Sequence, residues 1–182
     1  MSFSSDKALQ LLRDGNRRFA EGRPVHRFSA EERAAVVEGQ KPWAVIVGCS
    51  DSRVPVETVF DAGVGELFVV RCAGNVIGKV GFASARFAIE VLGAQTLVVL
   101  GHERCGAVEA ALSGSAPAWL EPVTSAIHLH EDCCESLTAV EYHIRESVTT
   151  LRDRLAAAGV EPVPLVIGGV YELASGEIRW LD

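Results

Sequence analysis

The sequence lacks the long apolar run that a transmembrane helix requires. No stretch of its 182 residues approaches the roughly 18 consecutive apolar residues of such a helix. The N-terminal stretch MSFSSDKALQLLRDG is charged and lacks the apolar centre of a signal peptide. We therefore expect a cytoplasmic protein with no membrane partner.

The sequence also lacks an excess of positive charge. Its 17 Lys and Arg residues are outnumbered by 24 Asp and Glu residues, which gives a net charge of −7 and argues against nucleic acid as a partner. Repeats and low-complexity tracts are absent too, and the length favours one domain over residues 1–182, with an N-terminal helical arm over about 1–40. In a cytoplasmic chain, we expect the five cysteines to be free thiols or metal ligands rather than disulfides.

Short apolar runs alternate with helical patterns along the chain. The runs at 43–48, 66–71, 96–101 and 163–173 predict buried strands, and a turn at Ser175-Gly176 precedes a short closing strand. Helices are expected over about 5–21, from Ser29, and over 81–92 and 136–158. Ser29 and Glu32 form the sequence pattern of a capping box. This alternation predicts an α/β fold with a mostly parallel central sheet flanked by helices.

Metal-capable side chains follow the predicted strands. Cys49 follows the first strand, Cys72 follows the second, and His102 and Cys105, spaced H-x-x-C, follow the third. Ligand sites of open parallel sheets lie beyond the carboxyl ends of the strands, so we expect these side chains to meet. Two thiolates and an imidazole suit Zn²⁺, and three protein ligands leave a fourth position open, as in catalytic zinc sites. H-x-x-C alone is a weak signal, because a lone cysteine after a strand is commonly a small buried residue.

Asp51 and Arg53 lie between this cysteine and the same edge of the sheet. In an extended segment, Cys49, Asp51 and Arg53 would project to one side. The aspartate could ligate the metal and close the site, or accept a hydrogen bond from a bound water. Arg53 favours the second role, because a guanidinium pairs with a carboxylate and keeps it ionised. The alternative is an exposed ion pair that contributes little.

Three motifs resemble those of the β-class carbonic anhydrases. They are GCSDSRV at 48–54, VVRCAGNV at 69–76 and VVLGHERCGAV at 98–108. GQKP at 39–42, GGVYELASGEI at 168–178 and LLRDGNRRFAEGRP at 11–24 are also similar to that family. The likeness runs in order over most of the chain, and Cys-x-Asp-x-Arg followed by His-x-x-Cys is highly specific.

The resemblance implies a function and a role for each matching position. Cys49, His102 and Cys105 would bind one Zn²⁺ per chain, and the dyad of Asp51 and Arg53 would orient a zinc-bound hydroxide that attacks CO₂ to form bicarbonate. The residues implied in substrate binding are Gln40, Phe68, Ala73, Phe87 and Gly106. The family fold is a parallel-centred α/β sheet, in a homodimer or tetramer with active sites at the dimer interface. Phe87 and Cys72 depart from the pattern, since many members have tyrosine and asparagine there.

Other functions and another metal site compete with this hypothesis. The same zinc chemistry could hydrolyse CS₂ or COS, and a catalytically weak member could serve as a structural zinc protein, although the intact ligands and dyad argue against that. A second cluster, HLHEDCC, contains His128, His130, Cys133 and Cys134. On a helix only His130 and Cys134 would share a face, so we expect no second metal site there. We expect His26 to be a loop residue and His143 to be structural or exposed.

Overall fold

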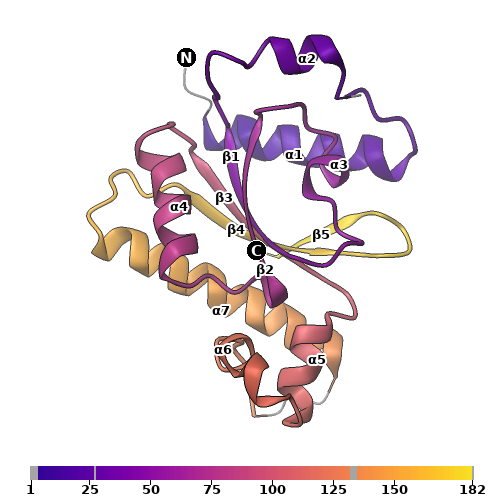
Figure 1. Cartoon of the computed structure of the whole chain (residues 1–182), viewed down its shortest axis with the longest axis vertical. Helices are drawn as coiled ribbons and strands as arrows, with labels where there is room; N and C mark the ends of the chain where they lie inside the picture. Colours follow the sequence, from indigo (N-terminus) through magenta and orange to yellow (C-terminus); the bar gives the residue numbers. More distant parts are fainter. Residues whose placement is uncertain (1–3, 27, 132–134, 182) are drawn as a thin grey trace.

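A five-stranded sheet forms the centre of the computed structural model, which describes residues 4–26, 28–131 and 135–181 (Figure 1). The strands are β1 (Ala44–Cys49), β2 (Leu67–Cys72), β3 (Thr96–His102), β4 (Leu165–Tyr171) and β5 (Ile178–Leu181). Their order is β2-β1-β3-β4-β5; the first four are parallel, and β5 is antiparallel to β4. The prediction of a mostly parallel sheet is therefore confirmed.

Helices cover both faces of the sheet because the apolar strands alternate their side chains between the faces. Ala44 and Ile46 of β1 pack in one buried cluster with α1 (Ser5–Ala20) and α3 (Val56–Val59). Val45 and Val47 pack in a second cluster with α4 (Lys79–Glu90) and α7 (Ser136–Ala157). Figure 1 shows these two helical layers on either side of the sheet. Among the described residues, no helix has both the length and the apolar character needed to cross a membrane.

The predicted elements agree with the structure except at some ends. Both α1 and α7 end one residue before the predicted boundary, and the capping box of Ser29 and Glu32 forms as predicted. The helix that it caps, α2 (Ala30–Ala34), has only five residues. Helix α4 begins and ends two residues before the prediction, because Gly78 is the N-cap. Strands β1 and β2 each start and end one residue later than predicted, so that Cys49 and Cys72 are their last residues.

Several short elements have no counterpart in the prediction. They are α3, α5 (Gly106–Ser113), α6 (Glu121–Thr124) and the 3-10 helices η1 (Ala73–Asn75) and η2 (Ala118–Leu120). Each has eight residues or fewer, which is too short for a recurring apolar face to stand out in the sequence. Two of them, η1 and α5, follow directly on β2 and on Cys105, and so they shape the edge where the candidate ligands lie.

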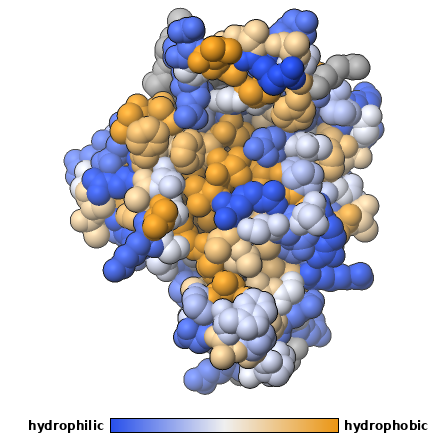
Figure 2. All heavy atoms as spheres, viewed as in Figure 1, coloured by the Kyte–Doolittle hydropathy of each residue, from blue (hydrophilic) through white to orange (hydrophobic). Residues whose placement is uncertain are grey.

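One side of the molecule carries apolar surface. Strand β2 is at the edge of the sheet, and its Phe68, Val69 and Val70 are only half-buried. On the neighbouring α4, Val80 is 82% exposed and Phe87 is 45% exposed. Figure 2 shows apolar side chains gathered across the middle of this face, where Figure 1 places β2 beside α4. We refer to these five residues as the β2–α4 face.

Candidate metal centre

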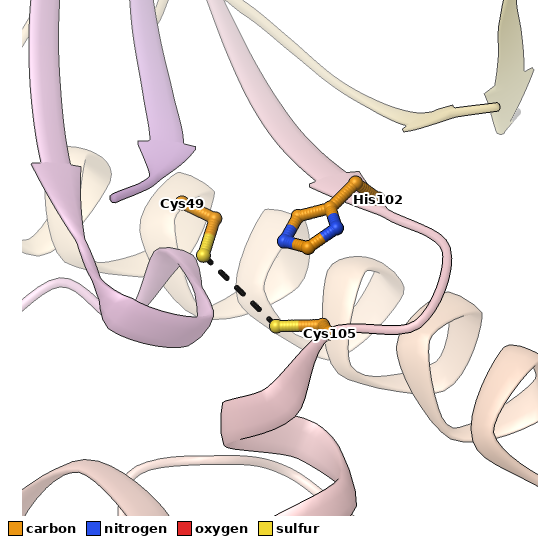
Figure 3. Close-up of side chains that lie close together, drawn as sticks. All are labelled: Cys49, His102 and Cys105. Carbon is orange, nitrogen blue, oxygen red and sulfur yellow. Dashed lines mark hydrogen bonds between the residues drawn. The ribbon is translucent and has the colours of Figure 1, made fainter. Parts of the chain in front are cut away.

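Cys49, His102 and Cys105 meet at the carboxyl ends of two neighbouring strands. Cys49 is the last residue of β1, His102 is the last residue of β3, and Cys105 is the N-cap of α5. Their side chains point to a common centre (Figure 3), and one ligand atom from each lies within 4.8 Å of the others. The two sulfur atoms are 4.0 Å apart. All three residues are buried, so the structure brings together the set predicted from strand ends.

The hydrogen bonds of His102 leave one ring nitrogen free for a metal. Nδ1 lies 2.8 Å from the carbonyl oxygen of Glu103. A carbonyl can only accept, so Nδ1 carries the proton and Nε2 keeps its lone pair. Nε2 is buried and has no hydrogen-bond partner among the described residues, an arrangement that costs about 1–3 kcal/mol unless another ligand is present. An unpartnered imidazole nitrogen facing two thiols fits a Zn²⁺ ion, and this carbonyl is the kind of outer partner that fixes a ligating histidine.

The polar groups around Cys49 favour its thiolate. The Cys105 thiol, above all, lowers the pKa of the Cys49 thiol by donating to its sulfur. The backbone N–H of Gly74 also donates to the Cys49 sulfur, at 3.3 Å. Metal ligands must be deprotonated, so these donors prepare Cys49 for binding.

Asp51 and Arg53 form a two-pronged ion pair beside the ligands. Arg53 Nε donates to Asp51 Oδ1 at 2.9 Å, and Nη2 donates to Oδ2 at 2.7 Å. Hydrogen bonds from the Arg53 side chain are the main cause that lowers the pKa of Asp51 to about 2, so the carboxylate is ionised near neutral pH. Its Oδ2 lies 3.7 Å from Nε2 of His102. The carboxylate therefore adjoins the candidate metal position with its charge shared with Arg53.

The segment that carries this pair is not extended. The expectation that Asp51 and Arg53 meet because alternate residues of an extended segment project to one side is therefore wrong in its cause. The chain turns directly after Cys49: the backbone N–H of Arg53 donates to Asp51 Oδ1, and that of Val54 donates to the Asp51 carbonyl. Aspartate commonly makes such a turn by bonding to the backbone two residues on. The turn folds Arg53 back onto Asp51, which alternation along a strand would not do.

Sequence reasoning missed two side chains that tie together the segments at the strand ends. Arg71 of β2 donates from Nε to the Cys49 carbonyl at 2.8 Å and from Nη2 to the Asp51 carbonyl at 2.7 Å. The Glu103 carboxylate accepts a hydrogen bond from the Leu173 backbone, which ties the segment after β3 to the segment after β4. Arg71 lies within the quoted motif VVRCAGNV, but nothing in its spacing indicates that its partners would be carbonyl groups.

The residues implied in substrate binding lie in different surroundings. The Phe68 and Phe87 rings contact each other with centroids 6.3 Å apart, on the β2–α4 face. Ala73 is half-buried in η1, and Gly106 is exposed at the start of α5, next to Cys105. Gln40 is exposed between α2 and β1. Their roles stay predictions, because a single chain leaves Phe87, Gly106 and Gln40 open to solvent.

The second histidine and cysteine cluster differs from its prediction. The sequence predicts a helical region around His128 and His130, but they lie in an irregular segment between α6 and α7, because α7 begins only at Ser136. Cys133 and Cys134 lie outside the described residues. His143 is buried on α7, and thus structural rather than exposed. His26 is a loop residue, as predicted, and its Nδ1 lies 3.0 Å from Glu32.

Comparison with known proteins gives consistent matches. The sequence model of a family described as carbonic anhydrase matches residues 44–178. A carbonic anhydrase of Mycolicibacterium smegmatis is 39% identical, over 94% of this chain and 91% of the relative. Carbonic anhydrase 2 of Mycobacterium tuberculosis is 39% identical, over 93% of this chain and 89% of the relative. The crystal structure of a β-carbonic anhydrase of Aspergillus fumigatus is similar with a TM-score of 0.74 at 26% identity, over 97% of this chain and 90% of that one.

Proposed function

Because this chain belongs to the β-class carbonic anhydrases, we propose that it hydrates CO₂ reversibly to bicarbonate and a proton, at a Zn²⁺ ion held by Cys49, His102 and Cys105. The observation that carries the proposal is the unpartnered Nε2 of His102, buried against two thiols and 3.7 Å from the Asp51 carboxylate. When bound, Zn²⁺ lowers the pKa of a water molecule towards about 7 and so supplies a nucleophile near neutral pH.

The chain's own residues orient that nucleophile. Asp51 accepts a hydrogen bond from a water molecule placed beside His102 Nε2, and this directs the oxygen lone pair towards the substrate. Arg53 keeps the carboxylate ionised, and by occupying both of its oxygens it opposes rotation of Asp51 onto the metal. Arg53 is itself held, because its Nη2 also donates to the Arg104 carbonyl at 3.2 Å.

A second copy of the chain would complete the substrate pocket. CO₂ is small and apolar, so it needs an enclosed apolar site, whereas Phe87 is 45% exposed in one chain. The β2–α4 face offers an unpaired strand edge together with exposed apolar side chains, and both favour association. We propose a homodimer with the sites at this interface. Cytoplasmic location and a further pairing into tetramers are expectations from the sequence and its family resemblance.

Stopped-flow measurement of CO₂ hydration by zinc-loaded protein, between about pH 6.5 and 9, tests the proposal. We expect a rate that rises to a plateau above a pKa near 7 to 8, as for a water that ionises on zinc. Absence of any rate above buffer, with one zinc per chain, would overturn it. Release of sulfide from CS₂ or COS by the same protein would then support the alternative hydrolase.

Two variants test the role of the dyad. Asp51→Asn keeps the size of the side chain but removes its charge, and we expect kcat to fall by about 10²-fold or more with zinc content unchanged. Asp14→Asn is the matched control, because Arg17 and Asp14 form an exposed ion pair on α1, away from the ligands and from the β2–α4 face. Equal losses in the two variants would contradict a special role for Asp51.

A further inference from the structure

His143 makes two hydrogen bonds that join three separate segments. Its Nε2 lies 2.8 Å from the Gly74 carbonyl oxygen in η1. Its Nδ1 lies 3.1 Å from the backbone nitrogen of His128, in the segment before α7. The His128 and His143 rings also contact each other, with centroids 5.6 Å apart. Helix α7 is thereby attached to the loop that follows β2.

The two partners fix the protonation state of this imidazole. A carbonyl oxygen only accepts and a backbone N–H only donates, so Nε2 carries the proton and Nδ1 accepts. Burial, above all, lowers the pKa of His143 to about 4, so the neutral ring persists near pH 7. The side chain is thus a fixed neutral donor towards Gly74.

Gly74 connects this donor to the metal centre. Its carbonyl faces His143, while its own N–H donates to the Cys49 sulfur at 3.3 Å. Gly74 has a φ of +65°, and a Cβ there would lie 3.1 Å from Ile127 and 3.2 Å from Ala107. Any other residue would therefore be strained here, and glycine has the greatest backbone freedom of any residue. Because this backbone rotates easily, the direction of the Gly74 N–H depends on the group that holds the Gly74 carbonyl, on the other side of the Cα.

We propose that His143 is a positioning residue of the metal centre: by holding the Gly74 carbonyl, it aims the Gly74 N–H at the Cys49 thiolate. The inference rests on the proposed zinc site. A donor to the thiolate stabilises its negative charge and fixes the direction of its lone pairs, as do other groups that surround metal ligands. Without His143, the buried Gly74 carbonyl would lose its partner and the loop could rotate.

Two amide variants separate the two hydrogen bonds of His143. His143→Gln places an amide nitrogen where Nε2 lies and keeps the donor to Gly74. His143→Asn reaches only the Nδ1 position, so it keeps an acceptor for the His128 N–H and loses the donor. Leu151→Ala is the control for general loss of stability, because Leu151 is buried on the same helix two turns further along.

The first readout is the zinc dissociation constant, measured by competition with a chromophoric chelator. The second is the thiolate-to-cobalt charge-transfer band of the Co²⁺-substituted protein. We expect His143→Asn to bind zinc about 10-fold more weakly and to shift the band, in line with other outer-sphere changes, while His143→Gln stays close to wild type. If the two amide variants match each other, or if Leu151→Ala weakens zinc binding as much as His143→Asn, the inference is wrong. A wild-type chain that binds no zinc would overturn the proposed function as well.

If the variants do not fold, a measurement on the wild-type protein still tests the inference. Ring ¹⁵N chemical shifts of His143 in the zinc-loaded chain should show Nε2 protonated and Nδ1 unprotonated at neutral pH. The opposite tautomer, or a charged ring at pH 7, would contradict a role as neutral donor to Gly74.

Discussion

Replacing Asp61 should cost more stability than replacing any exposed carboxylate of the chain. Its side chain is 1% exposed, and Arg18 Nε of α1 donates to it at 2.5 Å. The backbone N–H groups of Val25 and His26 donate to the same carboxylate at 3.0 Å. Asp61 thus holds the segment after α1 against the core. Removing its carboxylate leaves two backbone donors without an acceptor and leaves Arg18 only its bond to the Asp61 backbone carbonyl, at 3.3 Å.

The contacts set the size of the expected loss. Breaking a buried ion pair costs about 3–5 kcal/mol, and because Arg18 is 32% exposed and can be rehydrated, we expect about 3 kcal/mol for Asp61→Ala. Asp61→Asn keeps one acceptor oxygen and also tolerates the φ of +41° at this position, so we expect about 1–2 kcal/mol. The control is Asp14→Asn: Arg17 and Asp14 are 64% and 31% exposed, and a loss below about 0.5 kcal/mol is expected there.

Urea unfolding at several pH values, at one protein concentration, measures these losses and tests their origin. Burial opposes ionisation of Asp61, but Arg18 and the two backbone donors outweigh it and lower its pKa. A lowered pKa in the folded state gives stability that is present above the unfolded pKa of about 4 and is lost as pH falls through the folded value. The difference between wild type and Asp61→Asn should therefore be largest near neutral pH and shrink in acid. A pH-independent difference, or an equal loss in Asp14→Asn, would refute the reasoning.

Three further predictions concern the metal centre and the assembly. Cys49→Ser should leave far less than one zinc per chain by metal analysis. Cys72→Ser, at the paired position of the neighbouring strand, should keep one zinc per chain, and an equal loss of zinc in both variants would contradict the ligand assignment. Gly74→Ala should lower the free energy of unfolding by about 2–3 kcal/mol in urea, because of its positive φ and the contact with Ile127, and wild-type stability would contradict that strain. Val80→Asp should convert a dimer to a monomer in sedimentation velocity and remove CO₂ hydration while zinc stays bound; an unchanged dimer would exclude this interface.

Much of the fold could be predicted because its long elements carry repeated local signals. The helices α1 and α7 show apolar periodicity over several turns, and β1 and β3 each contain an unbroken apolar run next to polar or glycine residues. The ends of α4 could not be predicted as well, since Gly78 gives no side-chain cap and the apolar pattern continues past Glu90. The short η1 and α5 follow from how the chain leaves β2 and Cys105, which is determined by tertiary packing rather than by periodicity.

The clustering of Cys49, His102 and Cys105 could be predicted, whereas most of the groups that support it could not. Each ligand lies at or just after a strand end, and the topology of a parallel sheet brings such ends to one edge. The supports are backbone groups: the Glu103 carbonyl behind His102, the Gly74 N–H at Cys49 and the carbonyls held by Arg71. Every residue has such groups, so residue identity does not show which of them will be used. The contact of His143 with Gly74 also spans 69 positions of the chain.

The candidate site has two halves that depend differently on assembly. The metal half is buried within one chain and placed by strand ends, so its geometry needs no partner. The residues predicted to form the substrate half are Phe68 and Phe87, on an exposed face, and Gln40, on an exposed segment. Because an apolar substrate is retained only in a site shielded from water, the second half needs the cover that association would supply. Dissociation of the dimer should then leave zinc binding unaffected and abolish catalysis.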